Sequence, residues 1–423
     1  MLLLLKYQQL HNLSFLLDLC VDNVDNNNNN NNNNKKELFR ENHILYLRSA
    51  LRGLSRSFIT LDSSRPWICY WVTHALHLLD SDPIDIYPHL IHTLSLMQNR
   101  TGGFAGNIHQ ESHCAPTYAA ILCLCTIGTK EALEIIDRSA LYDFFLSMKV
   151  WLKDNNNKNK NYAGFRMHLD GEVDCRGTYT VLAIARLLNI LTPELVEGVA
   201  DFILSCATYE GGFGGEPGNE AHGGYNFCAM AGLLILGEDT YSKMDLDAQE
   251  YWLIRRQMQI EGGFQGRTNK LVDACYSFWQ GAALSIVDIM RNKGSDISDL
   301  YEWRKQKQEH QENNSFYVSK VHDNDGKLSF NQKRLQKYII RCGQVEGGGL
   351  RDKPGKSRDY YHSCYSLSGL SIAQWANNND DDTNTFNKAF VYGDATNVIL
   401  PTSSTFNIGL DKLDFCYKYF HNS

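Results

Sequence analysis

The chain has 423 residues, of which 43% are hydrophobic and 21% charged, enough for one large domain or two to three ordinary ones. Its formal net charge of −7 argues against a nucleic-acid-binding or anionic-membrane surface, because such surfaces need an excess of Lys and Arg. The twelve cysteines form no CxxC pair. In the absence of a secretory signal, they indicate reduced thiols of an intracellular protein.

The N-terminal stretch MLLLLKYQQLHNLSFLLDLC has no basic start, its apolar run is broken at Lys6–His11, and no cleavage site follows. It is too short and interrupted to span a membrane, so we expect a peripheral helix or a frayed end. Asn26–Asn34 is an uninterrupted asparagine run that cannot form a packed core. We therefore predict an extension over residues 1–40, one domain over residues 41–423, and a cytoplasmic protein that does not span a membrane.

Three further stretches are interpreted as insertions in surface loops, where added length costs little. Residues 154–161 and 377–386 are rich in Asn, and residues 291–330 form a charged stretch that predicts an added loop or helix. The acidic triplet Asp380–Asp382 resembles a metal–diphosphate motif. Because it lies inside an asparagine tract, we interpret it as part of a solvated loop.

A repeat follows in the chain, marked by glycine pairs or near-pairs before Phe. The copies are Gly102-Gly103-Phe104, Ala163-Gly164-Phe165, Gly211-Gly212-Phe213, Gly262-Gly263-Phe264 and a degenerate Gly347–Leu350. The tenth residue after the last Gly is always polar: His113, Asp174, His222, Asp273 and Asp359. The fifteenth is aromatic in the first four copies (Tyr118, Tyr179, Phe227 and Phe278), and Tyr365 lies one place later in the fifth. Spacings of 48 and 51 residues between the middle copies indicate stacked supersecondary units.

Each glycine turn precedes an apolar stretch of helix length: Pro116–Ile127, Thr178–Leu191, Gly224–Leu236, Cys275–Met290 and Cys364–Ala376. A sixth such stretch, Trp67–Leu79, precedes the first turn, and helices that are apolar nearly all round are buried. More amphipathic segments alternate with them, including Ile84–Met97, Leu195–Cys206 and Ala248–Met258. The pattern predicts an all-α fold, an α/α toroid with six inner and six outer helices (an α6–α6 barrel). Parallel inner helices would bring the polar tenth residues together at one end.

Asp273, Cys275 and His362 are the sharpest candidate site. A carboxylate, a thiolate and an imidazole suit a zinc ion that keeps its fourth position open. A buried Cys is more often a small hydrophobe, and Asp273 could simply cap its helix. The repeat favours the metal site, because His362 occupies nearly the same level of the next inner helix.

Arg267, Lys270, His222 and Tyr276 form a second candidate set, which Arg176 could join. Cations, an imidazole and a phenol near helix N-termini would hold a phosphate or diphosphate, whereas a solvated basic turn is the simpler alternative for Lys270. The sequence has no Walker-type loop, which argues against nucleotide binding. Aromatic residues recur at inner-helix positions, where they either fill a core or line a cavity for a long hydrocarbon together with Cys228. They are Trp67, Trp71, Tyr179, Tyr225, Trp279, Tyr361 and Tyr365.

These residues lie in long motifs that together resemble the protein farnesyltransferase β-subunit family. The motifs are SRPWICYW (64–71), HCAPTYAA (113–120), GEVDCRGTY (171–179), EAHGGYNFC (220–228), GGFQGRTNKLVDACYSFWQ (262–280) and DKPGKSRDYYHSCYSLSGLSIAQ (352–374). The resemblance implies one zinc ion held by Asp273, Cys275 and His362, with the fourth position for the cysteine thiol of a C-terminal CaaX motif. That sulfur, as a zinc-bound thiolate, would attack the first carbon of farnesyl diphosphate.

The resemblance also assigns the substrate-binding residues. His222, Arg267, Lys270 and Tyr276 match positions that hold the diphosphate, Gly223 and Gly224 are substrate-binding positions beside His222, and Asp352 matches a carboxylate associated with Mg²⁺. Trp67, Arg176, Tyr179, Tyr225, Cys228 and Trp279 match the isoprenoid tunnel, and Trp71 and Tyr361 match the CaaX pocket, with Ser64 nearby. Partners implied are an obligate helical α subunit and CaaX-terminated proteins such as small GTPases.

Trp67 with Tyr365, together with Asp352, favours the farnesyl over the geranylgeranyl type, because smaller tunnel residues would admit five more carbons. A geranylgeranyltransferase type I β subunit is the nearest alternative. A terpene cyclase would need an acidic motif that is absent outside the Asn tract. A non-catalytic toroid that serves as a binding scaffold belongs to a different class and predicts no bound zinc.

Overall fold

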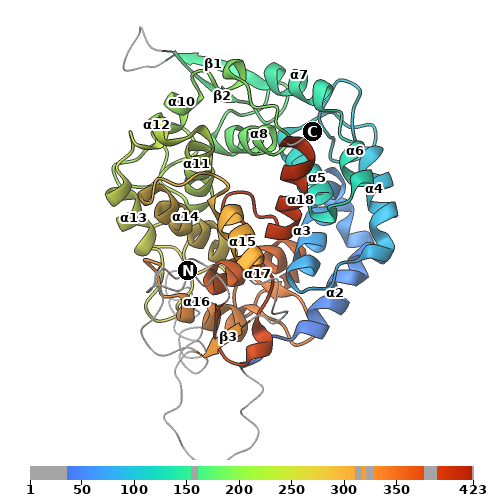
Figure 1. Cartoon of the computed structure of the whole chain (residues 1–423), viewed down its shortest axis with the longest axis vertical. Coiled ribbons are helices and arrows are strands. Elements are labelled where there is room, and N and C mark those ends of the chain that lie inside the picture. The colour runs from blue at the N-terminus through green and yellow to red at the C-terminus, as the bar shows by residue number, and fades with distance from the viewer. Residues whose placement is uncertain (1–35, 154–160, 310–316, 321–327, 376–387, 422–423) are drawn as a thin grey trace, which may run out of the picture.

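The protein is described by a computed structural model over residues 36–153, 161–309, 317–320, 328–375 and 388–421. Within these residues, six helices form an inner ring: α3 (Arg65–Leu78), α5 (Cys114–Ile127), α8 (Cys175–Leu187), α11 (Gly223–Leu236), α14 (Tyr276–Arg291) and α17 (Tyr360–Trp375). Each contacts the next in the chain, and α17 contacts α3, so the ring is closed (Figure 1). All six predicted inner helices are therefore confirmed, with ends shifted by a few residues.

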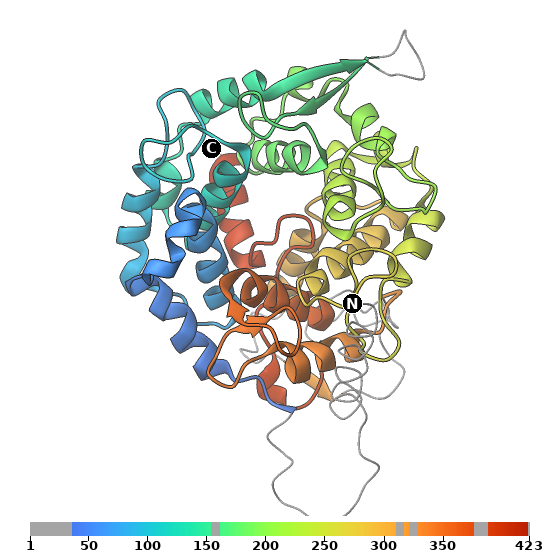
Figure 2. The same ribbon diagram turned by 180° about the vertical axis from the view of Figure 1, so that it is seen from behind.

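Six helices lie outside the ring in the described part of the chain (Figures 1 and 2): α2 (Arg40–Arg52), α4 (Tyr87–Ser95), α7 (Arg138–Met148), α10 (Val199–Ser205), α13 (Leu246–Ile254) and α16 (Gln332–Tyr338). Together with the inner ring they form the α/α toroid that the sequence predicts. The amphipathic segments predicted at residues 84–97, 195–206 and 248–258 correspond to α4, α10 and α13. The buried residues of α4 and α10 are apolar, whereas α13 buries Gln249 together with Trp252 and Leu253.

Further helices and strands lie between and around the two rings. The helices are η2 (Arg56–Ser64), η3 (Ile84–Ile86), α6 (Lys130–Glu134), α9 (Pro193–Val196), α12 (Glu238–Tyr241), α15 (Ser298–Glu309), η4 (Ile339–Gly343) and η5 (Ala395–Asn397). The strands form two-stranded sheets, antiparallel β1 (Lys149–Lys153) with β2 (Asn161–Phe165), parallel β3 (Tyr317–Lys320) with β6 (Lys388–Val391), and antiparallel β4 (Leu350–Arg351) with β5 (Arg358–Asp359). The predicted insertion at 291–330 contains α15. Those at 154–161 and 377–386, and the extension up to residue 35, lie largely outside the described residues.

The glycine turns that precede the inner helices pack closely against the outer helix of a neighbouring repeat. Gly102 has a φ of +88°, and a Cβ there would lie 1.9 Å from the carbonyl oxygen of Ala140 in α7. Gly348 has a φ of +85°, and a Cβ there would lie 2.0 Å from the carbonyl oxygen of Asn42 in α2. Only glycine combines this backbone conformation with such a close approach. The last repeat thus packs on the first outer helix and closes the toroid.

The polar tenth residues cap the inner helices at one end of the barrel, which we call the mouth. Four of the side chains accept a hydrogen bond from a backbone N–H of the first helical turn, as an N-cap does, and Asp273 accepts one from Cys275, the residue before the first turn of α14. The residues are His113 (to Ala115 N, 3.0 Å), Asp174 (to Arg176 N, 2.7 Å), His222 (to Gly224 N, 3.1 Å), Asp273 (to Cys275 N, 3.0 Å) and Asp359 (to His362 N, 2.7 Å). The predicted convergence of these polar residues is confirmed.

The opposite end of the barrel is covered by residues Thr402–Gly409, which we call the crossing segment. The hydroxyl groups of Tyr70 and Tyr179 donate to the carbonyl oxygens of Asn407 and Thr405, both at 2.7 Å. The last helix, α18 (Leu410–His421), then packs on α5 and α8. The sequence did not predict this closure.

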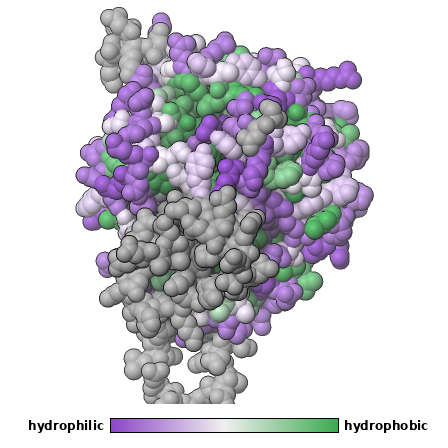
Figure 3. All heavy atoms as spheres, in the orientation of Figure 1, coloured by the Kyte–Doolittle hydropathy of each residue, from purple (hydrophilic) through white to green (hydrophobic). Residues whose placement is uncertain are grey.

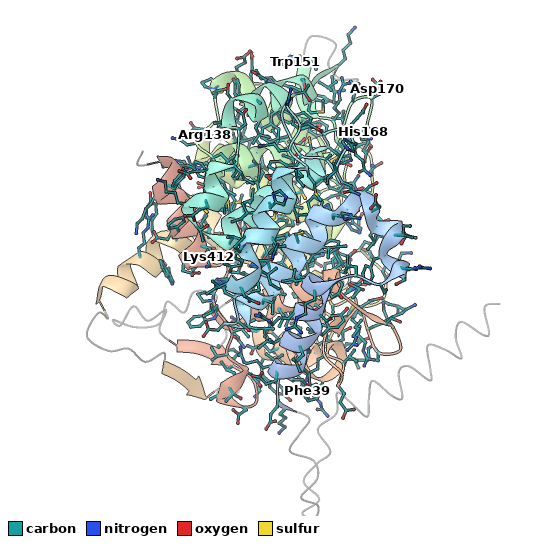
Figure 4. All side chains as sticks on the ribbon, turned by 90° about the vertical axis from the view of Figure 1, so that its right-hand side faces the viewer. Phe39, Arg138, Trp151, His168, Asp170 and Lys412 are labelled. Atoms are coloured by element: carbon teal, nitrogen blue, oxygen red, sulfur yellow. The ribbon has the colours of Figure 1, made fainter. Side chains whose placement is uncertain are left out.

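Figure 4 shows the two ends in one view: His168 and Asp170, at a hairpin tip of the mouth, lie opposite Lys412 of α18. From the closed end, mainly hydrophilic residues are seen around an apolar area in the upper half (Figure 3). Among the described helices, none is both long and apolar enough to cross a bilayer. The candidate site residues gather at the mouth, because the N-termini of the inner helices lie there.

Candidate active site

Asp273, Cys275 and His362 meet at the mouth, with one ligand atom of each within 4.8 Å of the others. Asp273 accepts the N–H of Cys275, which is the N-cap residue of α14, and His362 lies in the first turn of α17. The N–H of Ala274 donates to the carbonyl oxygen of Asp352 at 2.8 Å, which fastens α14 to the hairpin before α17. Residues 89 positions apart are thus brought together by the neighbouring inner helices.

The imidazole of His362 is held between two carboxylates. Nδ1 lies 2.6 Å from Oδ2 of Asp359, and Nε2 lies 3.2 Å from Oδ1 of Asp273. Burial alone would lower the pKa of His362, but the hydrogen bonds with Asp273 and Asp359 outweigh it and raise the pKa to about 9. A proton on Nε2 therefore lies between His362 and the Asp273 carboxylate, among the three atoms that could hold a metal ion.

The other two donors also fit a cation. Burial would raise the pKa of Asp273, yet hydrogen bonds from His362 and from the N–H of Cys275 lower it to about 2, so the carboxylate is ionised. Burial, followed by the Asp273 carboxylate, raises the pKa of the Cys275 thiol well above its ordinary value. A bound cation is what would stabilise the thiolate here. A buried thiol, an ionised carboxylate and an oriented imidazole form a donor set of the zinc type.

Asp359 was predicted only as a polar repeat position, and the structure gives it a second task. Its Oδ1 caps α17 by accepting the N–H of His362, and its Oδ2 accepts from Nδ1 of the same residue. Metal-ligating histidines commonly donate their other ring nitrogen to a carboxylate, which fixes the ring. The i, i+3 spacing on a helix was the sequence signal for this pair.

His222 and Tyr276 also meet, with Nε2 and Oη 3.0 Å apart. Because Nδ1 of His222 accepts the N–H of Gly224, the proton of the neutral ring lies on Nε2 and donates to Tyr276. Burial, and next the charge of Arg267, lowers the pKa of His222, which favours the neutral ring. The hydroxyl proton of Tyr276 is thereby left to donate to another acceptor. Gly223 lets its loop pack against α14, because a Cβ there would lie 2.4 Å from Nε2 of Gln280 and 3.0 Å from Cδ1 of Tyr276.

The predicted cations lie around this pair on the rim of the mouth. Arg267 pairs with Glu220 at 2.8 Å, and Arg176 pairs with Asp174 at 2.6 Å. Tyr225 lies beside them: the Arg176 guanidinium is 5.3 Å from its ring centroid, and the ring of His222 is 5.5 Å away. Lys270 is exposed at the hairpin tip and follows Arg267 by three residues. Glu220, which the sequence did not single out, orients Arg267.

Asp352 lies beside the metal-type donors and forms an ion pair with Lys353. Burial, opposed by that ion pair and reinforced by the Asp273 carboxylate, raises the pKa of Asp352. The Asp273 and Asp352 carboxylates repel each other, and the Lys353 ammonium offsets part of that repulsion.

Aromatic side chains of all six inner helices touch in a closed cycle, which we call the aromatic belt. Consecutive ring centroids lie 4.4–5.8 Å apart, within the range of favourable aromatic pairs. The members, in cyclic order, are Trp67, Tyr118, Tyr179, Phe227, Trp279, Tyr365, Tyr361 and Trp71. Six of these eight were predicted as core-filling or cavity-lining residues, and Tyr118 and Phe227 were predicted as aromatic repeat positions. Cys228 is buried on the same helix as Phe227.

The belt adjoins the metal-type donors directly. Tyr361 precedes His362 in α17, and their ring centroids lie 5.0 Å apart. The indole N–H of Trp279 donates to the hydroxyl of Tyr361 at 3.2 Å, which fixes the two rings relative to each other. The aromatic belt and the metal-type donors therefore adjoin each other.

Comparison with known proteins gives this arrangement a family. Residues 38–408 match the model of the prenyltransferase alpha-alpha toroid domain. The chain is 40% identical to the protein farnesyltransferase subunit beta of Pisum sativum, over 84% of this chain and 89% of the relative. It is 37% identical to the corresponding subunit of Arabidopsis thaliana, over 91% of this chain and 83% of the relative.

The chain belongs to the protein farnesyltransferase β-subunit family. Two Arabidopsis thaliana proteins show that the chain is more similar to farnesyltransferase than to geranylgeranyltransferase subunits. Its identity is 37% to the protein farnesyltransferase subunit beta and 27% to the geranylgeranyl transferase type-1 subunit beta. A solved Candida albicans protein geranylgeranyltransferase-I complexed with GGPP has the same fold as this farnesyltransferase-family chain. Its TM-score is 0.63 at 20% identity, over 91% of this chain and 99% of that chain. The predicted family and fold are confirmed.

Proposed function

We propose that this chain is the catalytic β subunit of a zinc-dependent protein farnesyltransferase. It would transfer the farnesyl group of farnesyl diphosphate to the cysteine thiol of a C-terminal CaaX motif. The observation that carries the proposal is the contact of Tyr361, a member of the aromatic belt, with His362 of the donor set. An apolar tail and a thiol can meet only where an apolar lining and a cation site adjoin.

Zinc fits Asp273, Cys275 and His362, because the three side chains offer one oxygen, one sulfur and one nitrogen and leave room for a fourth ligand. When bound, zinc would favour the thiolate form of the substrate cysteine, which is the better nucleophile. His362 is kept in place by Asp359, and the buried position of Cys275 excludes water from one side of the site. Mg²⁺ would be held by Asp352 and would assist the departing diphosphate.

The diphosphate would lie on the rim, among His222, Arg267, Lys270 and Tyr276. As the bond to the first farnesyl carbon breaks, negative charge grows on the diphosphate oxygens. The free hydroxyl proton of Tyr276 and the guanidinium of Arg267 would stabilise that charge. Arg176 and the N-terminus of α11, with the N–H groups near Gly223 and Gly224, would add to the positive field.

The farnesyl chain would pass from the rim into the barrel along the aromatic belt, with Tyr225 and Cys228 beside it. The CaaX peptide would lie against Trp71 and Tyr361, near Ser64, which precedes α3. The proposal includes cytoplasmic proteins with CaaX termini, such as small GTPases, as substrates and an α subunit as an obligate partner.

The test is prenyl transfer by the chain co-expressed with an α subunit, with farnesyl and geranylgeranyl diphosphate offered in competition to a CaaX peptide. We expect one zinc per heterodimer and a preference for farnesyl diphosphate. A wild-type complex without zinc and without transfer would leave only the toroid, and the scaffold hypothesis would replace this one.

Trp67 decides the choice of isoprenoid in this proposal. Its ring packs on Tyr118 at 5.8 Å and on Trp71 at 5.5 Å, so it takes up volume inside the ring. Trp67→Thr should raise the use of geranylgeranyl relative to farnesyl diphosphate by about tenfold, since extra methylene groups in an apolar pocket contribute about 1–3 kcal/mol. An unchanged ratio would mean that another residue limits the chain length.

A further inference from the structure

The proposed diphosphate residues come from two different repeats. His222 caps α11, whereas Arg267 and Lys270 lie at the hairpin tip before α14. A backbone hydrogen bond from the N–H of Gly223 to the carbonyl oxygen of Gly266, at 2.7 Å, joins the two loops. Away from this bond, a separate set of side chains also spans them.

The carboxylate of Glu210 contacts both loops. Its Oε1 accepts the N–H of Ala221 at 3.3 Å, and its Oε2 accepts the hydroxyl of Thr268 at 3.1 Å. Ala221 directly precedes His222, and Thr268 directly follows Arg267. One side chain therefore fixes each loop at the residue next to a proposed diphosphate ligand.

Arg256 completes the connection from α13's C-terminal end. It is only 5% exposed, its Nη1 donates to the Thr268 hydroxyl at 2.8 Å, and its Nε donates to the carbonyl oxygen of Trp252 at 3.3 Å. A hydroxyl can accept one hydrogen bond while it donates another, so Thr268 links the buried cation to the Glu210 carboxylate. A buried charge is costly unless it is paired, which makes this arrangement hard to rearrange.

We infer that Glu210, Thr268 and Arg256, which we call the interloop bridge, are positioning residues for the diphosphate. They set the separation of His222 from Arg267 and Lys270, and hence the fit of two linked phosphate groups between them. The inference rests on the proposed function and goes beyond it by assigning three residues that touch no substrate. Displacing a binding group by a fraction of an ångström is enough to weaken a preorganised site.

The experiment measures binding of inorganic pyrophosphate, and separately of farnesol, to the complex with the α subunit. The matched pairs are Thr268→Val against Thr268→Ser, and Glu210→Ala against Glu216→Ala, where Glu216 is an exposed carboxylate on the same loop. We expect Thr268→Val and Glu210→Ala each to weaken pyrophosphate binding about tenfold, with unchanged farnesol binding and zinc content. Thr268→Ser and Glu216→Ala should bind pyrophosphate like the wild type. The double variant Thr268→Val with Glu210→Ala should lose little more than either single one, because the residues act as one unit.

Wild-type pyrophosphate affinity in Thr268→Val would overturn the inference, as would an equal loss of farnesol binding, which would indicate general distortion of the barrel. A wild-type complex that binds no pyrophosphate would overturn it too. Failure of the proposed function is distinguishable, because it would appear as absent farnesyl transfer by a wild type that still binds pyrophosphate in a bridge-dependent way.

Discussion

The two ends of the inner barrel are built from the same six helices but differ in the hydrogen bonds that their side chains make. At the mouth, helix N-termini are capped by side chains such as His222 and Asp273 that keep further ligand atoms available. At the closed end lies the crossing segment, whose carbonyl oxygens accept hydrogen bonds from the hydroxyl groups of Tyr70 and Tyr179, which lie within α3 and α8 and not at their ends. Free N–H groups and the positive end of the helix dipole favour anions, so an anionic substrate is expected at the mouth. The closed end supplies rigidity instead.

Among the residues that hold the diphosphate, the largest effect that separates the two ends is expected for Tyr276→Phe. The change removes the hydroxyl proton that His222 leaves free for the diphosphate, and loss of one such donor typically costs about 10²–10³-fold in rate. We expect farnesyl transfer to fall by on the order of 10²-fold with zinc content unchanged. Single-turnover kinetics at saturating substrate would show this, and Tyr70→Phe at the closed end is the control that should leave the transfer rate nearly unchanged.

A smaller effect is expected for Asp359→Ala, which frees Nδ1 of His362. Removal of the carboxylate behind a metal-ligating histidine typically lowers metal affinity 10–100-fold. Competition of the complex with a zinc chelator measures the loss directly. Wild-type zinc affinity in this variant would mean that α17 alone orients His362.

The third prediction concerns the closed end, where His77 lies between Asp82, at 3.1 Å, and Asp411, at 3.0 Å, and Lys412 also pairs with Asp82. Burial opposes the charged ring, but the hydrogen bonds to Asp411 and Asp82 raise the pKa of His77 to about 9. Its stabilising contribution is therefore complete below the unfolded pKa of about 6.5 and is lost as the pH rises through about 9. The loss is on the order of 1–3 kcal/mol in the free energy of unfolding.

Denaturant unfolding of the complex at pH 6.5 and 9.5 checks this, with His77→Gln for comparison. The variant should lose less stability over that interval, because the other titrating groups contribute equally to both proteins. An identical pH dependence would show that the charged ring of His77 does not fasten α18 through Asp411.

The mouth could be predicted from sequence and the closed end could not, for a physical reason. Asp273 and His222 stand at a fixed distance from a glycine turn, and that local pattern recurs with every repeat. The crossing segment has no period, and its residues resemble an ordinary polar loop. Its burial arises from contacts such as that between Tyr70 and Asn407, which are 337 residues apart.

The same limit applies within the site. Asp359 could be recognised from the sequence as a repeat position. Its two hydrogen bonds with His362 follow only once both residues lie at the start of α17. Glu210 and Glu220 could not be singled out, because each pairs with a residue of the next repeat and no sequence spacing fixes such pairs. Side-chain bonds between repeats are the part that needs the structure.

The measurement that tests the central claim most directly is the zinc content and farnesyl transfer of Cys275→Ala beside Cys416→Ala, both in complex with the α subunit. Both cysteines are buried, one at the mouth and one at the closed end. Removal of a carboxylate that only orients a metal ligand typically lowers metal affinity about 10–100-fold. Removal of the ligand Cys275 itself should therefore reduce zinc affinity and transfer by more than about 100-fold. Cys416→Ala should keep one zinc and its activity. Full zinc content and transfer in Cys275→Ala would contradict the account.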